Sequence, residues 1–180
     1  MAYLLIDGYN LIGTAHDNLE KVRNDLIEKI LKYSEIKKHH ITLVFDGWKS
    51  GQKEQTEMKT RDVTVIYSRL GEKADFLIIK LLKSSTIPWI VVSSDREISE
   101  YAATHDHAAV SSAEFEEKLY LALRNSDEGP SHAGPSAGVS LLKDNRDNDE
   151  DIASRPARSR GNPRQLSKRL KKKIQALSKL

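Results

Sequence analysis

The chain has 180 residues, no cysteine and a formal net charge of +3. This length is enough for one domain with a sizeable core, and the lack of cysteine excludes a disulfide framework and thiolate metal sites. No apolar run approaches the roughly 20 residues of a membrane-spanning helix, and the first residues lack the apolar stretch of a signal peptide. We therefore expect a cytoplasmic protein with no membrane partner.

The charge is distributed unevenly along the chain. Residues 155–180 hold ten Lys or Arg and no acid, whereas residues 126–154 hold two Lys or Arg and seven acids. A concentrated basic block favours nucleic acid or an acidic surface as a partner.

Apolar runs alternate with helical patterns over the first part of the chain. We expect strands at residues 3–6, 41–45, 63–67, 90–92 and 108–110, and helices at about 19–38, 74–83, 96–104 and 111–124. The polar segment 46–62 is weakly periodic, which indicates a loop or a loose helix. Apolar strands that alternate with helices are typical of a parallel sheet covered on both faces, so the sequence predicts an α/β sandwich.

The composition changes after residue 125, and we divide the chain there. Residues 1–125 form the predicted domain, and residues 126–161, rich in Ser, Gly, Pro and Asp, form a predicted flexible linker. Asn162 and Pro163 are typical of a helix start, which predicts a basic amphipathic helix over residues 162–180. Its apolar face is expected to hold Leu166, Leu170, Ile174 and Leu177.

Four acids fall where this sheet would place the carboxyl ends of its strands. Asp7, Asp46 and Asp95 each follow a predicted strand, and Asp75 lies at the start of the helix after the third strand. Sites in open α/β sheets form at that edge. Asn10 follows Asp7 closely, and its amide is suited to orienting a water or a phosphate without adding charge.

Carboxylates that crowd into one cleft repel one another, and a divalent cation removes that cost. Mg²⁺ prefers oxygen ligands, and two such ions could activate a water and stabilise the leaving oxygen in phosphodiester cleavage. The alternative is that each acid is only a helix cap or a turn residue. That alternative is strongest for Asp95, which begins a good capping sequence.

Four segments together resemble the motifs of NYN domains, a branch of the PIN-like nuclease superfamily, and the YacP-like subfamily in particular. They are "LLIDGYNLI", "LVFDGW", "GEKADFLI" and "VVSSDREI". The resemblance covers about residues 1–125. It implies a PIN-like three-layer α/β/α sandwich with a mostly parallel sheet, and RNA cleavage that depends on Mg²⁺ or Mn²⁺.

The resemblance also implies roles for individual residues. Asp7 matches the first metal-binding acid and Asn10 the polar position beside it, and the further acids of the proposed metal site are Asp46, Asp75 and Asp95. The subfamily includes a ribosome-associated endoribonuclease, so RNA and the ribosome are the candidate partners.

Several cations lie near these acids or in the basic tail, and phosphate contacts provide most non-specific affinity for nucleic acids. The candidate RNA-binding residues are Lys49, Lys53, Lys59, Arg61, Arg69, Lys73, Arg169, Lys171, Lys172 and Lys173. The alternative for those near the acids is a solvated surface. The tail helix could bind RNA, pack its apolar face on the domain or a partner, or act only as a solubilising extension.

Two aromatic residues, Tyr9 and Trp48, lie next to proposed site residues. Either could stack on an unpaired base, although packing in the core or at its rim is the commoner role.

Three functions remain to be compared. The first is a metal-dependent endoribonuclease, and the second is a non-catalytic RNA- or ribosome-binding module. Clustered acids argue against the second, because they would repel RNA. The third, a phosphoacceptor receiver domain, fits poorly: its pattern needs a pair of acids after the first strand, where this chain offers only Asp7.

Overall fold

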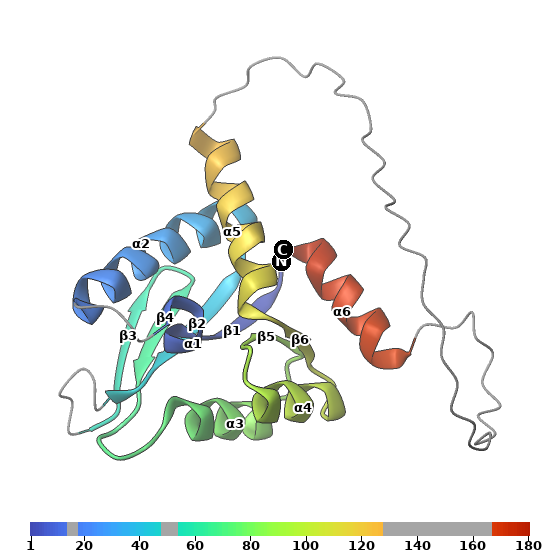
Figure 1. Cartoon of the computed structure of the whole chain (residues 1–180), viewed down its shortest axis with the longest axis horizontal. Helices are drawn as coiled ribbons and strands as arrows, with labels where there is room; N and C mark the ends of the chain where they lie inside the picture. The colour runs from blue at the N-terminus through green and yellow to red at the C-terminus, as the bar shows by residue number, and fades with distance from the viewer. Residues whose placement is uncertain (14–17, 48–53, 128–166) are drawn as a thin grey trace, which may run out of the picture.

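The computed structural model describes residues 1–13, 18–47, 54–127 and 167–180. Its centre is a six-stranded sheet in the order β3-β4-β2-β1-β5-β6, in which β3 is antiparallel to β4 and all other pairs are parallel (Figure 1). The strands are β1 (Tyr3–Asp7), β2 (His40–Phe45), β3 (Thr56–Thr60), β4 (Val63–Tyr67), β5 (Trp89–Val92) and β6 (Ala108–Val110).

Helices cover both faces of the sheet. They are α1 (Gly8–Ile12), α2 (Leu19–Lys37), α3 (Ala74–Ser84), α4 (Arg96–Thr104), α5 (Ser112–Asp127) and α6 (Lys168–Lys179). Helices α3 and α4 pack on one face, and α1, α2, α5 and α6 pack on the other (Figure 1). The predicted three-layer sandwich is confirmed. None of the described helices is long and apolar enough to cross a membrane.

Strand β1 shows why the central strands read as continuous apolar runs. The sheet pleat sends Leu4 and Ile6 to the core beneath α2 and α5, and Leu5 to the core beneath α3 and α4. All three side chains are fully buried, and each such burial contributes roughly 1.5–3 kcal/mol. A strand with helices on both faces therefore has no polar alternation, and its carboxyl end is held firmly in place.

The segment 46–62 differs from the expected loop or loose helix, because Thr56–Thr60 forms β3. This strand lies at the edge of the sheet and is exposed over most of its length. Its pairing with β4 relies on backbone hydrogen bonds, in a register that places Thr56 opposite Tyr67 and Thr60 opposite Val63. Polar side chains suit such an edge strand, so the strand carries no apolar signal.

Helix α1 is a second element that the sequence did not predict. Asp7 caps it, because its side chain accepts a hydrogen bond from the backbone N–H of Asn10. Gly8 begins the helix against the ring of Phe45, where a Cβ atom would lie 2.2 Å from the nearest ring carbon. Gly8 therefore allows the start of α1, next to Asp7, to pack closely on Phe45 at the end of β2.

Helix α6 packs on the domain beside β6. The described part begins at Lys168 with Ser167 as its cap; the expected start at Asn162 and Pro163, Leu166, and residues 128–161 of the expected linker lie outside the described residues. The buried contacts come from Ala176 and Leu180, with Leu177 packed against the same core.

The expected apolar face of α6 is therefore wrong in part. Leu170 and Ile174 are exposed, at 41% and 50%. Two hydrogen bonds fix the end of the helix instead: the Tyr33 hydroxyl donates to the carbonyl of Leu180 (3.0 Å), and His39 Nε2 lies 3.0 Å from the carbonyl of Lys179. Since a carbonyl only accepts, His39 Nε2 carries the proton.

Candidate active site: an acidic cleft at the carboxyl edge of the sheet

One cleft of about 370 Å³ gathers the four predicted carboxylates and Asn10. It lies at the carboxyl edge of the sheet, where the parallel strands end. Its lining residues are Asp7, Tyr9, Asn10, Gly13, Asp46, Ala74, Asp75 and Asp95. We call this site the acid cleft.

Asp7 is the most deeply buried of the four acids, with 5% of its surface exposed. One carboxylate oxygen accepts the N–H of Asn10 (3.1 Å), and the other lies 3.5 Å from the hydroxyl of Ser93. The pKa of Asp7 is raised to about 6, chiefly by burial. The negative charges of Asp75 and Asp46 contribute to this rise, and the hydrogen bonds from Asn10 and Ser93 oppose it.

Asp46 joins the end of β2 to the start of α3. Its Oδ1 accepts the backbone N–H of Ala74 at 2.5 Å, which caps α3, since Lys73 at the N-cap position forms no side-chain cap. The next residue, Gly47, donates its N–H to the hydroxyl of Ser68 (3.0 Å). A Cβ atom at Gly47 would collide with the carbonyl of Ser68. The backbone after Asp46 is thus held close to the end of β4.

Asp75 lies in the first turn of α3 and is partly exposed. Burial raises its pKa, and the charges of Asp95 and Asp46 add to that effect. The ammonium of Lys73 opposes it. Two acids of the cleft therefore hold protons more tightly than isolated aspartates, and both do so partly because of the other acids around the cleft.

Asp95 caps α4, as its sequence context indicated. Its Oδ1 accepts the N–H of Ile98 (3.0 Å). Its own backbone N–H donates to the hydroxyl of Ser93 (3.1 Å), the same hydroxyl that lies beside Asp7. Capping and membership of the acid cleft are thus compatible, because one carboxylate oxygen of Asp95 is left for the cleft. Ser93 is a linking residue whose role the sequence did not reveal.

Asn10 is anchored more firmly than expected. Its side-chain oxygen accepts the N–H of Ser94 (2.8 Å) and the hydroxyl of Ser112 (2.7 Å). A backbone N–H can only donate, so the amide oxygen faces Ser94 and the NH₂ group points elsewhere. Asn10 thus ties the start of α1 to the loop after β5 and to the start of α5, and only its NH₂ group is left to contact a ligand.

The donor set fits a hard divalent cation, because every charged ligand in the acid cleft is a carboxylate oxygen. Within the described ranges, no three His, Asp or Glu side chains are close enough to hold one ion together. Mg²⁺ and Mn²⁺ are often held by one or two carboxylates, with waters and substrate phosphates as the other ligands. The acid cleft suits that mode of binding.

A model of the YacP-like NYN domain family matches residues 4–177. The chain belongs to this family. The match includes most of α6, so the family pattern extends beyond residue 125, where the resemblance in sequence was expected to end. An uncharacterized protein YacP of Bacillus subtilis is 33% identical over 93 residues. That alignment covers 47% of this chain and 53% of the relative, and thus spans only about half of the relative's length.

Two crystal structures of Rae1 (YacP) from Bacillus subtilis share the fold of this NYN domain. One of them, a point mutant, matches with a TM-score of 0.58 at 24% identity, covering 71% of this chain and 80% of the other. The second structure matches with a TM-score of 0.56 at 24% identity, covering 71% and 78%. The fold is therefore PIN-like, and the chain contains a nuclease-like domain.

The structure separates the candidate RNA-binding cations near the acids into two groups. Arg69 and Lys73 lie between β4 and α3, on the side of the acid cleft. Lys59 and Arg61 lie near the amino end of β4, at the opposite edge of the sheet, and Arg61 forms an ion pair with Glu35 of α2. They are not beside Asp46 as expected, because β3 runs away from the cleft. Lys49 and Lys53 lie outside the described residues.

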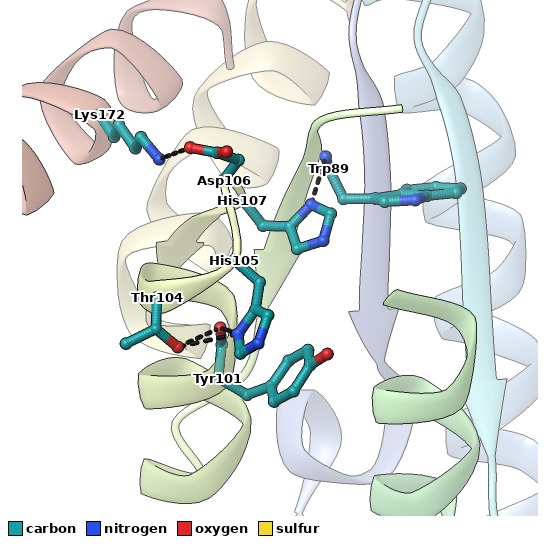
Figure 2. Close-up of polar contacts among 7 residues, drawn as sticks. All are labelled: Trp89, Tyr101, Thr104, His105, Asp106, His107 and Lys172. Atoms are coloured by element: carbon teal, nitrogen blue, oxygen red, sulfur yellow. Dashed lines mark hydrogen bonds and ion pairs between the residues drawn. The ribbon is translucent and has the colours of Figure 1, made fainter. Parts of the chain in front are cut away.

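The candidate RNA-binding cations of α6 also fall into two groups, one in ion pairs with the domain and one exposed. Lys172 pairs with Asp106 (2.7 Å; Figure 2), and Lys173 pairs with Glu114 at the start of α5 (2.8 Å). Arg169 and Lys171 are exposed. The helix packs on the domain, as one of the three interpretations expected, and two of its lysines form ion pairs there. RNA binding by the tail stays a prediction.

Tyr9 is buried, with 4% of its surface exposed, and meets the ring of Phe45 edge-on at 5.1 Å between centroids. It packs in the core, so the interpretation of Tyr9 as a base-stacking residue is wrong. Trp48 lies outside the described residues.

Proposed function

We propose that this NYN domain is an endoribonuclease that uses Mg²⁺ or Mn²⁺ at the acid cleft to cleave RNA phosphodiester bonds. The observation that carries the proposal is the arrangement of Asp7, Asp46, Asp75 and Asp95 around one cleft, with the pKa of Asp7 raised to about 6. This arrangement lowers the stability of the metal-free fold, as is typical of a site selected for function. RNA at the ribosome is the candidate substrate that the YacP-like resemblance suggests.

A divalent cation in the acid cleft would supply the positive charge that activates a water and stabilises the leaving oxygen. The residues of the chain hold the ligands in place. Asp7 is oriented by Asn10 N–H and Ser93. Asp46 and Asp95 each use one oxygen as a helix cap and keep the other for a ligand. Arg69 and Lys73 lie where they could contact the RNA backbone.

The test is cleavage of end-labelled RNA in Mg²⁺ or Mn²⁺ by the full chain. We expect Asp7→Asn and Asp75→Asn each to lower the rate by at least about 100-fold, since each removes a carboxylate that the cation needs. Asp106→Asn is the matched control, because it removes an exposed acid that pairs with α6 away from the cleft; its rate should stay close to wild type.

Cleavage that is undiminished in both cleft variants would contradict the proposal. RNA binding without cleavage in either metal would instead indicate a non-catalytic RNA-binding module.

A further inference from the structure

One face of α3 and its N-cap residue is exposed and carries cations around an aromatic ring. Lys73, Phe76, Lys80 and Lys83 are separated by three, four and three positions, which places them on one side of a helix. All four are exposed, whereas Leu77, Ile78 and Leu82 on the other side are buried against the sheet. We call these four exposed residues the α3 track.

Phe76 is unusual because 63% of its surface is exposed. It forms part of a shallow hollow of about 480 Å³, lined by Phe76, Ile79, Lys80, Lys83 and Ser84. The hollow thus combines two apolar side chains, Phe76 and Ile79, with two cations, Lys80 and Lys83. This combination fits a flat apolar group that is attached to an anion.

The α3 track begins at the acid cleft. Ala74 and Asp75 line the cleft, and Phe76 is the next residue of the same helix. From Lys73 to Lys83 the helix extends about 15 Å. Helix α3 lies beside α4 on the outer face of the sheet, away from α2, α5 and α6 (Figure 1). The surface is therefore continuous with the cleft and is not covered by the other described helices.

We propose that the α3 track binds single-stranded RNA next to the acid cleft, with Phe76 stacking on an unpaired base and Lys73, Lys80 and Lys83 contacting phosphates. The proposal rests on the proposed function in that RNA is taken to be the substrate. It also gives the path of the RNA, which would run from the acid cleft along α3.

Charge favours RNA over a protein partner. In the part of the chain that the structure describes, no ion pair with an acid is formed by Lys73, Lys80 or Lys83. The ammonium of Lys83 lies 5.7 Å from the ring centre of Tyr101, a cation–π contact that brings no negative charge to the lysine. Proteins that bind single strands combine such cations with an aromatic ring that stacks on a base. A base within a duplex is already stacked and cannot occupy the ring.

The test is fluorescence anisotropy with a labelled single-stranded oligouridylate of about 12 nucleotides, in EDTA so that cleavage does not interfere. We expect Phe76→Ala to weaken binding by about 5- to 100-fold. Phe76→Leu should weaken it similarly, because leucine is apolar but has no π face. Phe76→Trp should bind like wild type, and its additional fluorescence should be quenched by the oligonucleotide.

Tyr120→Ala is the matched control. Tyr120 is also 63% exposed but lies on α5, on the other face of the sheet, and its loss should leave the affinity unchanged. Replacing Lys80 and Lys83 with alanine should reduce the slope of log affinity against log salt by about 0.7 for each phosphate that the variant no longer neutralises.

The proposal would be overturned by wild-type protein that does not bind the oligonucleotide at low salt, by equal affinities of the Phe76→Ala and Tyr120→Ala variants, or by full affinity in Phe76→Leu. The two proposals fail separately. If RNA binding requires Phe76 but no cleavage occurs in Mg²⁺ or Mn²⁺, the α3 track is supported and the proposed nuclease activity is contradicted. If the wild type cleaves RNA and the Phe76→Ala variant binds RNA with unchanged affinity, the nuclease activity is supported and the α3 track is contradicted.

Discussion

At the carboxyl edge of the sheet, four aspartates share one cleft. Burial, and to a smaller extent the repulsion between these acids, raises the pKa of Asp7 and of Asp75. On α6, by contrast, Lys172 and Lys173 each face an acid of the domain. The charges of α6 are thus partly matched within the fold, whereas no acid of the cleft forms an ion pair with the described residues. Charge that a protein leaves without an ion pair in a concave site is typical of a site that binds a ligand of opposite sign. The difference therefore supports the proposed cation site at the acid cleft and a structural role for the charges of α6.

The largest expected effect on stability comes from neutralising Asp7. Asp7→Asn should raise the free energy of unfolding in EDTA at pH 8 by about 2–3 kcal/mol, because it removes a buried charge and keeps a capping oxygen. The folded-state pKa of about 6 exceeds the ordinary aspartate value of 3.8. The contribution of Asp7 to the unfolding free energy of the wild type is therefore fully present below about pH 4 and is lost as the pH rises through 6.

Urea denaturation of both proteins from pH 4 to 8 measures this effect. The gain from Asp7→Asn should shrink towards zero at the acidic end. A variant that is less stable than wild type at pH 8 would show that the charge of Asp7 is matched within the fold after all.

The docking of α6 should respond next most strongly to Tyr33→Phe. The Tyr33 hydroxyl is buried and donates to the carbonyl of Leu180, and burial raises its pKa so that it stays a donor. Losing this bond should cost about 1–2 kcal/mol of unfolding free energy. Urea denaturation checks the value, with Tyr120→Phe on the exposed face of α5 as the control. Equal stability of the two variants would contradict the described contact.

The pH dependence of α6 docking should have the opposite sign to that of the acid cleft. Burial lowers the pKa of His39, against the raising effect of its bond to Lys179. A lowered folded-state pKa means that stability is present above about pH 6.5 and is lost as pH falls.

Comparison of wild type with His39→Gln isolates this contribution, because Asp7 titrates in both proteins. The unfolding free energy of wild type should fall more than that of His39→Gln between pH 7 and pH 5. Parallel pH profiles of the two proteins would contradict a lowered pKa of His39 in the folded protein.

The smallest effect is expected at the partly exposed pair of Lys173 and Glu114. Glu114 also accepts the N–H and hydroxyl of Ser111 in a capping box at the start of α5, so it keeps partners without the lysine. Lys173→Met should therefore change the unfolding free energy by less than about 1 kcal/mol. A larger loss on urea denaturation would mean that charge pairing, rather than the burial of Ala176 and Leu180, holds α6.

The parallel core and the acid cleft could be predicted from the sequence because both depend on buried strands that are easy to recognise. Buried strands read as apolar runs, and parallel strands place their carboxyl ends at one edge. The strand Thr56–Thr60 could not be predicted, because an exposed edge strand forms through backbone hydrogen bonds to its neighbour and needs no apolar side chains. Arg61 was misplaced for the same reason: without β3, nothing in the sequence shows that the chain leaves the cleft and returns.

The contacts within the cleft were less predictable than its membership. Asp46 caps α3 from 28 residues away, and Asn10 is tied to Ser112 across 102 residues; such long-range bonds leave no local pattern. The face on which α6 packs was also missed, because Ala176 is a small residue and Leu180 lies at the helix end. The more apolar Leu170 and Ile174 stay exposed.

Calorimetric titration of Mn²⁺ into the full chain tests most directly whether the unmatched charge of the acid cleft is a cation site. Wild-type protein and Asp106→Asn should bind Mn²⁺ alike, and Asp7→Asn and Asp75→Asn should bind it at least about 10- to 100-fold more weakly. Equal Mn²⁺ affinity in all four proteins would contradict a metal site at the acid cleft.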